Sequence, residues 1–190
     1  MISAGLQRSL ICVASANLAA FAIEAAAARA IGSVSLLADS ASFLSAAFLY
    51  LLAFGALRWP RGRVVVGGAC AALIIACLFG ALGMALAKYR APIPPDPFVL
   101  SFVGAAALAV HLFCAFIIAV HRWSARPPVR TVLVAARYDM LVKVAIIETG
   151  VLTAFVWRAP WPDVITGLAL VVLNADAARR VWMAARQQPL

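Results

Sequence analysis

The chain has 190 residues, of which 66% are apolar and 12% charged, and it carries a formal net charge of +9. A soluble domain is nearer one half apolar and one quarter charged, so this composition excludes an ordinary soluble fold. Helices that face lipid explain it, because their outer surfaces stay apolar. The length suffices for six membrane spans with short connections, and we expect no soluble domain.

Six apolar runs, each long enough to cross a bilayer, predict six transmembrane helices. We therefore predict an all-α membrane protein with a single transmembrane domain over residues 1–190. The first run is too long for a typical signal-peptide core and contains Glu24, so we retain it as a helix. Proline-rich stretches separate several runs, since proline cannot continue a helix. The predicted spans cover residues 9–31, 33–57, 64–87, 98–120, 131–156 and 164–183.

The basic residues predict the orientation, because short cytoplasmic loops are enriched in lysine and arginine. Eleven arginines fall on the side of both termini, and four basic residues fall on the other side, so we expect both termini in the cytoplasm. Short loops and many arginines suit a bacterial inner membrane. No basic helix with interleaved aromatic residues is present, so we expect no nucleic-acid partner. The eleven are Arg8, Arg58, Arg61, Arg63, Arg122, Arg126, Arg130, Arg137, Arg179, Arg180 and Arg186, and the four are Arg29, Lys88, Arg90 and Arg158.

Several ionisable residues lie inside the predicted spans, where each charge costs at least about 2.5 kcal/mol. One interpretation is a polar pathway for a cation or proton through the first, second and fifth spans. The other is a set of internal ion pairs that fix helix packing. Asp139 and Lys143 are four residues apart and can pair directly, and the lysine stem can also reach toward Asp39 or Glu148. The pathway candidates are Asp39, Asp139, Lys143, Glu148 and Glu24.

Four further features have simpler interpretations. Glu24 could pair with Arg29 on the same helix or cap a polar cluster. His111 stands alone in the fourth span, and we expect it to hydrogen-bond between helices rather than to bind a metal. The third and fourth spans otherwise look like packing elements. We expect the cysteines to behave as small hydrophobic residues; they are Cys12, Cys70, Cys77 and Cys114.

Four segments together resemble the cation diffusion facilitator family over nearly the whole chain. They are Asn17 to Glu24, Gly32-Ser33-Val34-Ser35-Leu36-Leu37-Ala38-Asp39-Ser40, Ala136-Arg137-Tyr138-Asp139, and Trp161-Pro162-Asp163 with Gly167 and Leu168. The resemblance implies six spans with cytoplasmic termini, export of divalent cations such as zinc in exchange for protons, and a dimer. It also implies a C-terminal cytoplasmic domain, which we do not expect in this chain.

The family's transport site resembles a cage of four ligands, two on the second helix and two on the fifth. By position these ligands fall on Ser42, Ala46, Asp139 and Lys143. Only Asp139 is a good ligand, and a lysine ammonium repels a divalent cation. We therefore predict a degenerate site in which Lys143 takes the place of the metal, tethered to Asp139 and also to Asp39. We expect no cofactor, and zinc or another divalent cation only if the site functions.

Two functions from different classes remain open. The first is a membrane transporter of the cation diffusion facilitator type, with proton-coupled cation efflux at Asp39, Asp139 and Glu148. The second is a transport-inactive membrane subunit or pseudotransporter in a larger complex. The expected partners are the lipid bilayer and either a second copy or a larger membrane complex. We expect no enzyme, because serine–histidine, paired catalytic aspartate and HExxH arrangements are missing from the sequence.

Overall fold

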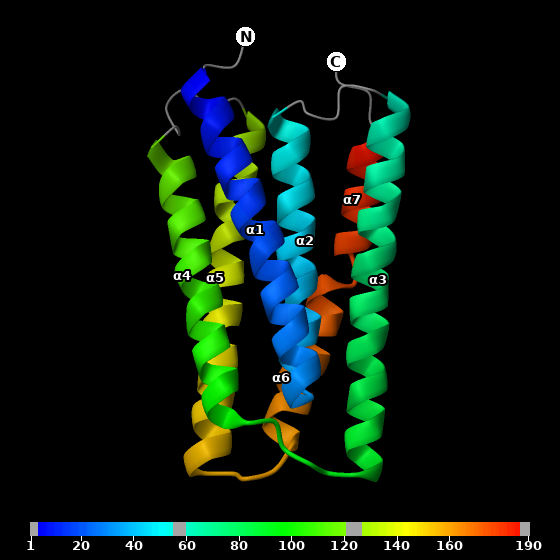
Figure 1. Cartoon of the computed structure of the whole chain (residues 1–190), viewed down its shortest axis with the longest axis vertical. Helices are drawn as coiled ribbons and strands as arrows, with labels where there is room; N and C mark the ends of the chain where they lie inside the picture. The colour runs from blue at the N-terminus through cyan, green and yellow to red at the C-terminus, as the bar shows by residue number, and fades with distance from the viewer. Residues whose placement is uncertain (1–3, 55–59, 121–126, 187–190) are drawn as a thin grey trace.

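The computed structural model describes residues 4–54, 60–120 and 127–186, and these residues form an elongated bundle of helices (Figure 1). Within these ranges the secondary structure is helical, with no strand. The all-α prediction is therefore confirmed for this part of the chain. The helices are α1 (Ala4–Ile31), α2 (Val34–Phe54), α3 (Pro60–Arg90), α4 (Pro97–Val120), α5 (Pro127–Phe155), α6 (Trp161–Asn174) and α7 (Ala177–Arg186).

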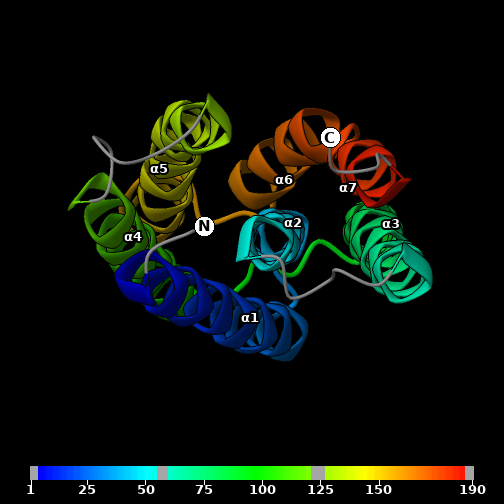
Figure 2. The same ribbon diagram turned by 90° about the horizontal axis from the view of Figure 1, so that it is seen from above.

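Helix α2 lies at the centre of the bundle. Seen along the bundle axis, it is surrounded by α1, α3 and α6, while α4 and α5 pair on one side and α3 and α7 on the other (Figure 2). The membrane-length window of α2 is 78% buried inside the protein, whereas that of α3 is 28% buried. A polar side chain on α2 is therefore far more enclosed by protein than one on an outer helix.

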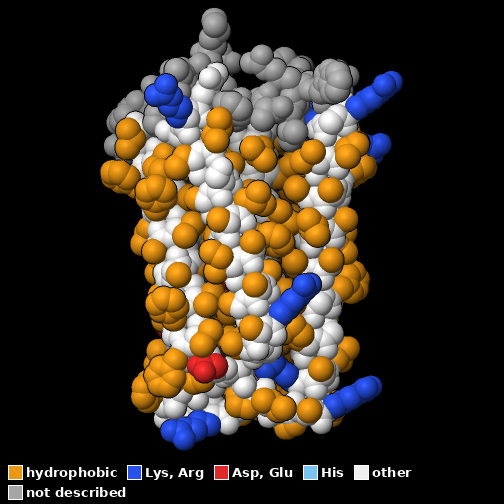
Figure 3. Space-filling model, in the orientation of Figure 1, with side chains coloured by type: hydrophobic (Ala, Val, Ile, Leu, Met, Phe, Trp, Pro, Cys, Tyr) orange, Lys and Arg blue, Asp and Glu red, His pale blue; other side chains and the backbone are white. Residues whose placement is uncertain are grey.

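Four helices, α1 to α4, are long and apolar enough to cross a membrane. On the face shown in Figure 3, apolar side chains cover most of the described length of the bundle. Large aromatic side chains such as Phe79, Phe102 and Phe116 are exposed there. Such a surface suits hydrocarbon rather than water, so the chain is a membrane protein.

The sixth predicted span is wrong as a continuous helix. Residues 164–183 are divided between α6 and α7, with a turn at Ala175 and Asp176. The Ala175 amide donates back to the Val172 carbonyl at 3.3 Å, and the Arg180 amide of α7 donates to the Asp176 carbonyl at 2.9 Å. Asn174 beside the break donates to the Ala38 carbonyl of α2 at 3.2 Å. The predicted span was continued through Asn174 and Asp176 to residue 183, and the structure instead ends α6 at Asn174.

Other predicted boundaries differ by shorter distances. Helix α3 extends through charged residues beyond the predicted 64–87 because those residues find partners at its ends. Arg63 Nε donates to the Ala185 carbonyl at 2.8 Å, and Lys88 Nζ donates to the Ile93 carbonyl at 2.8 Å. The last predicted residues of the second span, 55–57, lie outside the described part of the chain.

A buried carboxylate joins the α1–α2 turn to α6. Gly32 has a φ of +65°, and the Ser33 amide reaches back to the Ala28 carbonyl at 2.8 Å, which is a glycine-based helix ending. Asp163, in the first turn of α6, then accepts hydrogen bonds from the amides of Val34 and Ser35 at 2.8 and 3.1 Å. It also accepts from the hydroxyls of Ser33 and Ser35, each at 2.7 Å. Asp163 thus caps α2 from another helix.

Candidate functional site

The antiparallel register of α1 and α2 places Glu24 opposite Asp39. On one side of them Ala20 packs in a cluster with Phe43, and on the other Ala28 packs in a cluster with Leu36 to Ala38. Residue numbers rise along α1 and fall along the facing stretch of α2, so Glu24, midway between Ala20 and Ala28, lies at the level of Asp39. Asp39 and Lys143 are the charged groups that interact with Glu24.

Lys143 reaches from α5 to α2 and forms a buried ion pair there. Its Nζ lies 2.6 Å from Asp39 Oδ1, and both side chains are 0% exposed. It also donates to Ser42 Oγ at 3.1 Å and lies 4.3 Å from the centre of the Phe43 ring. Charge, hydrogen bonding and a cation–π contact therefore all hold the ammonium against α2.

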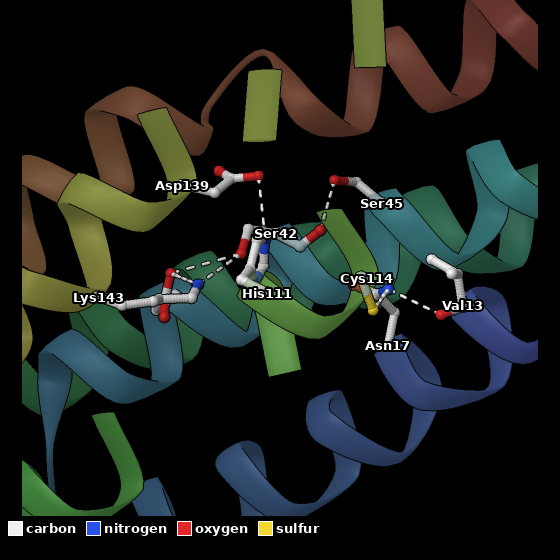
Figure 4. Close-up of polar contacts among 9 residues, drawn as sticks. Val13, Asn17, Ser42, Ser45, His111, Cys114, Asp139 and Lys143 are labelled. Carbon is white, nitrogen blue, oxygen red and sulfur yellow. Dashed lines mark hydrogen bonds and ion pairs between the residues drawn. The ribbon is translucent and has the colours of Figure 1, made fainter. Parts of the chain in front are cut away.

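Asp139 pairs with a different helix. His111 Nε2, on α4, lies 3.3 Å from Asp139 Oδ2, and the His111 ring packs edge-on against Phe43 at a centroid distance of 4.7 Å. Figure 4 shows Asp139 turned toward His111, while Lys143 turns toward the Ser42 side chain of α2. The predicted contact between helices for His111 agrees with this geometry. Helix α4 is therefore more than a packing element.

Of the two tethers expected for Lys143, the structure has the one to Asp39 and not the one to Asp139. The four-residue spacing suggested that Lys143 is tethered to Asp139, but its hydrogen bonds go to Asp39 and Ser42 instead. The physical reason is that α2 offers two acceptors at one level, whereas the Asp139 carboxylate is occupied by the imidazole. The side chain of Asp139 is 32% exposed, so an ionised Asp139 costs less free energy without a counter-charge than the fully buried Asp39 does.

Glu24 and Glu148 are placed differently from each other. Glu24 is buried at 2% exposure, and its carboxyl oxygens have no hydrogen-bond partner in the described chain. Arg29, the partner considered from the sequence, is exposed. Glu148 is exposed on α5 and lines a groove of about 580 Å³ between α5 and α6. Glu148 therefore does not join the other carboxylates in the described structure.

Two polar residues were not recognised as important from the sequence alone. Asp163 was noted only as part of a motif, although it makes more hydrogen bonds than any intramembrane candidate above. Asn17 donates to the Val13 carbonyl at 2.8 Å and to Cys114 Sγ at 3.4 Å, which ties α1 to α4.

The positions expected to hold a metal offer a poor donor set. Ser42 is engaged with Lys143, Ala46 has no donor atom, and Asp139 is paired with His111. Across residues 4–54, 60–120 and 127–186, no group of three or more histidine, cysteine, aspartate or glutamate side chains is placed to hold a metal ion. A zinc site normally needs three or four protein ligands, so the residues present do not fit a resident metal.

A comparison of the sequence with protein-family models and with curated proteins finds no match. The functional argument therefore depends on the geometry of this chain.

Proposed function

We propose that the chain is a transport-inactive membrane subunit, built on a six-span arrangement like that of cation diffusion facilitators. In it the Lys143 ammonium serves as a permanent internal cation. The observation that carries the proposal is the fully buried contact of Lys143 Nζ with Asp39 Oδ1 and Ser42 Oγ. A tethered cation there disfavours a divalent ion by charge repulsion. The remaining function of such a fold is to pack against a partner in the membrane.

The first experiment is zinc binding by the purified protein in detergent, measured calorimetrically. We expect no stoichiometric binding by the wild type. A triple variant, Ser42→His, Ala46→Asp and Lys143→Asp, supplies four donors with Asp139 and is expected to bind one zinc ion per chain. Lys143→Met is the matched control, because it removes the ammonium without adding a ligand. Stoichiometric zinc binding by the wild type that Asp139→Ala abolishes would contradict the proposal.

The second experiment addresses the partner. We expect the tagged full chain, extracted in a mild detergent, to co-purify with a membrane protein in a fixed ratio. Identification of that protein and co-expression with it test whether the ratio is reproducible. A chain that purifies by itself and carries zinc across vesicle membranes would overturn the subunit proposal.

A second candidate function is proton-coupled cation transport, and one observation favours it. Asp139 is partly exposed, and His111, its partner, has an Nδ1 atom with no hydrogen bond in the described chain. This pair therefore could exchange a proton with one side of the membrane. Reconstituted vesicles with a pH gradient and a metal-sensitive dye test this function, and Asp139→Asn is expected to abolish any uptake that occurs.

A further inference from the structure

Two carboxyl groups and one ammonium meet where α1, α2 and α5 come together. Glu24 is 2% exposed, and Asp39 and Lys143 are 0% exposed. If all three were ionised, the cluster would carry one uncompensated negative charge among apolar helices. Such a charge costs several kcal/mol in a low-dielectric interior. The cluster needs one further positive charge or one fewer negative charge.

The free hydrogen-bonding atoms indicate where that compensation takes place. Lys143 occupies Asp39 Oδ1 and leaves Asp39 Oδ2 without a partner. Both oxygens of Glu24 also have no partner within the described ranges. Three buried acceptors without a donor therefore lie at one level of the bundle, on two side chains that face each other. Buried polar atoms are rarely left in this state.

The other titratable groups near the cluster do not supply the missing donor. On α1, Arg29 is exposed. On α4, His111 directs Nε2 to Asp139, and its Nδ1 makes no hydrogen bond in the described chain, so it donates to neither carboxyl group. On α5, Asp139 is itself an acceptor for His111. A donor supplied from outside these side chains is required.

We propose that Glu24 and Asp39 form a proton-binding site, in which one proton resides on the Glu24 carboxyl and its O–H donates to Asp39 Oδ2. The charges then balance: Glu24 is neutral, Asp39 is negative and Lys143 is positive. One proton also satisfies Asp39 Oδ2 and one Glu24 oxygen together. Two carboxyl groups in close contact generally share a proton in this way, because both cannot ionise at low cost.

Proton binding at this site couples pH to the α1–α2 contact. With the proton bound, the hydrogen bond joins the two helices and no net charge is buried. Loss of the proton at alkaline pH removes the hydrogen bond and leaves two facing carboxylates that share one ammonium. The stabilisation is therefore present at low pH and is lost as the pH rises.

Infrared spectroscopy of the full chain in lipid nanodiscs tests the proposal directly. We expect a carbonyl band of a protonated carboxylic acid at neutral pH, which shifts on exchange into heavy water. Glu24→Gln is expected to remove this band and to keep the melting temperature, because the glutamine amide is neutral and donates to Asp39. Glu24→Ala is expected to lower the melting temperature by several degrees. Glu148→Gln, at an exposed carboxyl, is the matched control and is expected to retain the band.

Two results would overturn the proposal. The first is a wild type with no protonated-acid band at neutral pH, or with a band that Glu24→Gln leaves unchanged. The second is a melting temperature that rises with sodium or potassium concentration in the wild type but not in Glu24→Gln, because a bound metal cation would then occupy the site. Neither result depends on zinc binding or on a protein partner, so this proposal and the proposed function can fail separately.

Discussion

At the residue scale, the buried ion pair of Lys143 leads to a prediction about the free energy of unfolding. Lys143→Met removes the ammonium and leaves the Asp39 carboxylate at 0% exposure without a counter-charge. Loss of one member of a buried pair costs about 3–5 kcal/mol because the other charge is then uncompensated. We expect Lys143→Met to lower the free energy of unfolding by this amount, measured by denaturation with SDS in mixed micelles.

The double variant Lys143→Met with Asp39→Asn serves as the control for that prediction. It removes both charges, so we expect it to recover most of the stability lost in Lys143→Met. The exposed pair of Arg179 and Asp176, 3.7 Å apart, is a second control, because Arg179→Ala is expected to change the free energy of unfolding by less than about 1 kcal/mol. A large loss in the double variant would show that the side-chain shapes, and not the charges, determine the effect.

The sequence was sufficient to select these residues and to name Asp39 and Asp139 as partners of Lys143, but not to decide between the two carboxylates. Each charge inside an apolar run has to be compensated, so Asp39, Asp139 and Lys143 could be chosen by position. Spacing along α5 favoured Asp139 as the partner of Lys143, whereas the contact between α2 and α5 provides Asp39 and Ser42 at closer range. Contacts between helices that are distant in sequence decide the pairing, and no local pattern encodes them.

At the element scale, the start of α2 depends on a carboxylate from α6. Asp163→Ala removes an acceptor shared by two amides and two serine hydroxyls. Hydrogen bonds to a charged group each contribute about 1.5–3 kcal/mol, so we expect a loss of at least about 3 kcal/mol in the free energy of unfolding. Hydrogen exchange at the Val34 and Ser35 amides is expected to accelerate in the same variant.

Asp96 offers a matched comparison for the Asp163 variant. Its carboxylate caps α4 through the amides of Phe98 and Val99 at 2.9 and 3.0 Å, but it does so locally and at the surface. We expect Asp96→Ala to cost about 1 kcal/mol, as is usual for a helix cap. Equal losses in the two variants would contradict the view that Asp163 fixes the position of α6 against α2.

The close approach of α2 and α6 requires a residue without a side chain at Gly167. A Cβ atom there would lie 2.5 Å from Val34 Cγ1 and 2.8 Å from the Ser35 nitrogen, so backbone as well as side chain would have to move. We expect Gly167→Ala to lower the free energy of unfolding by about 1–3 kcal/mol. Gly83→Ala, where a Cβ meets nothing within 4 Å, is the control and is expected to cause no loss.

At the scale of the whole molecule, hydropathy located the helices better than it located their ends. Runs of apolar residues mark α1 to α4 correctly, because a helix in hydrocarbon needs apolar side chains along its whole length. Hydropathy did not predict the break between α6 and α7, because an average over apolar residues does not include the partners of Asn174 and Asp176. The predicted cluster likewise lacked His111 of α4, which only the packing of α4 on α5 brings to Asp139.

The charge distribution along the bundle leads to a topology prediction. Helix α1 begins and helix α7 ends at the same end of the bundle (Figure 1). Among residues with described side chains, six arginines lie toward that end, and four basic residues lie toward the other. The six are Arg8, Arg61, Arg63, Arg179, Arg180 and Arg186, and the four are Arg29, Lys88, Arg90 and Arg158. The sequence count of eleven also includes Arg58, Arg122 and Arg126, which lie outside the described residues, and Arg130 and Arg137, whose side chains are not described.

We therefore expect a six-span topology with the arginine-rich end in the cytoplasm, as the positive-inside rule requires. A green fluorescent protein fused after Arg186 is expected to fluoresce, and alkaline phosphatase fused there is expected to be inactive. The same reporters placed in the segment 91–96, between α3 and α4, should give the reverse result, because that segment lies at the other end of the bundle. Fluorescence from both positions would contradict an odd number of spans between them. Replacing Arg61, Arg63 and Arg179 with glutamine reduces the charge difference, and we expect it to produce a mixed orientation if that difference sets the topology.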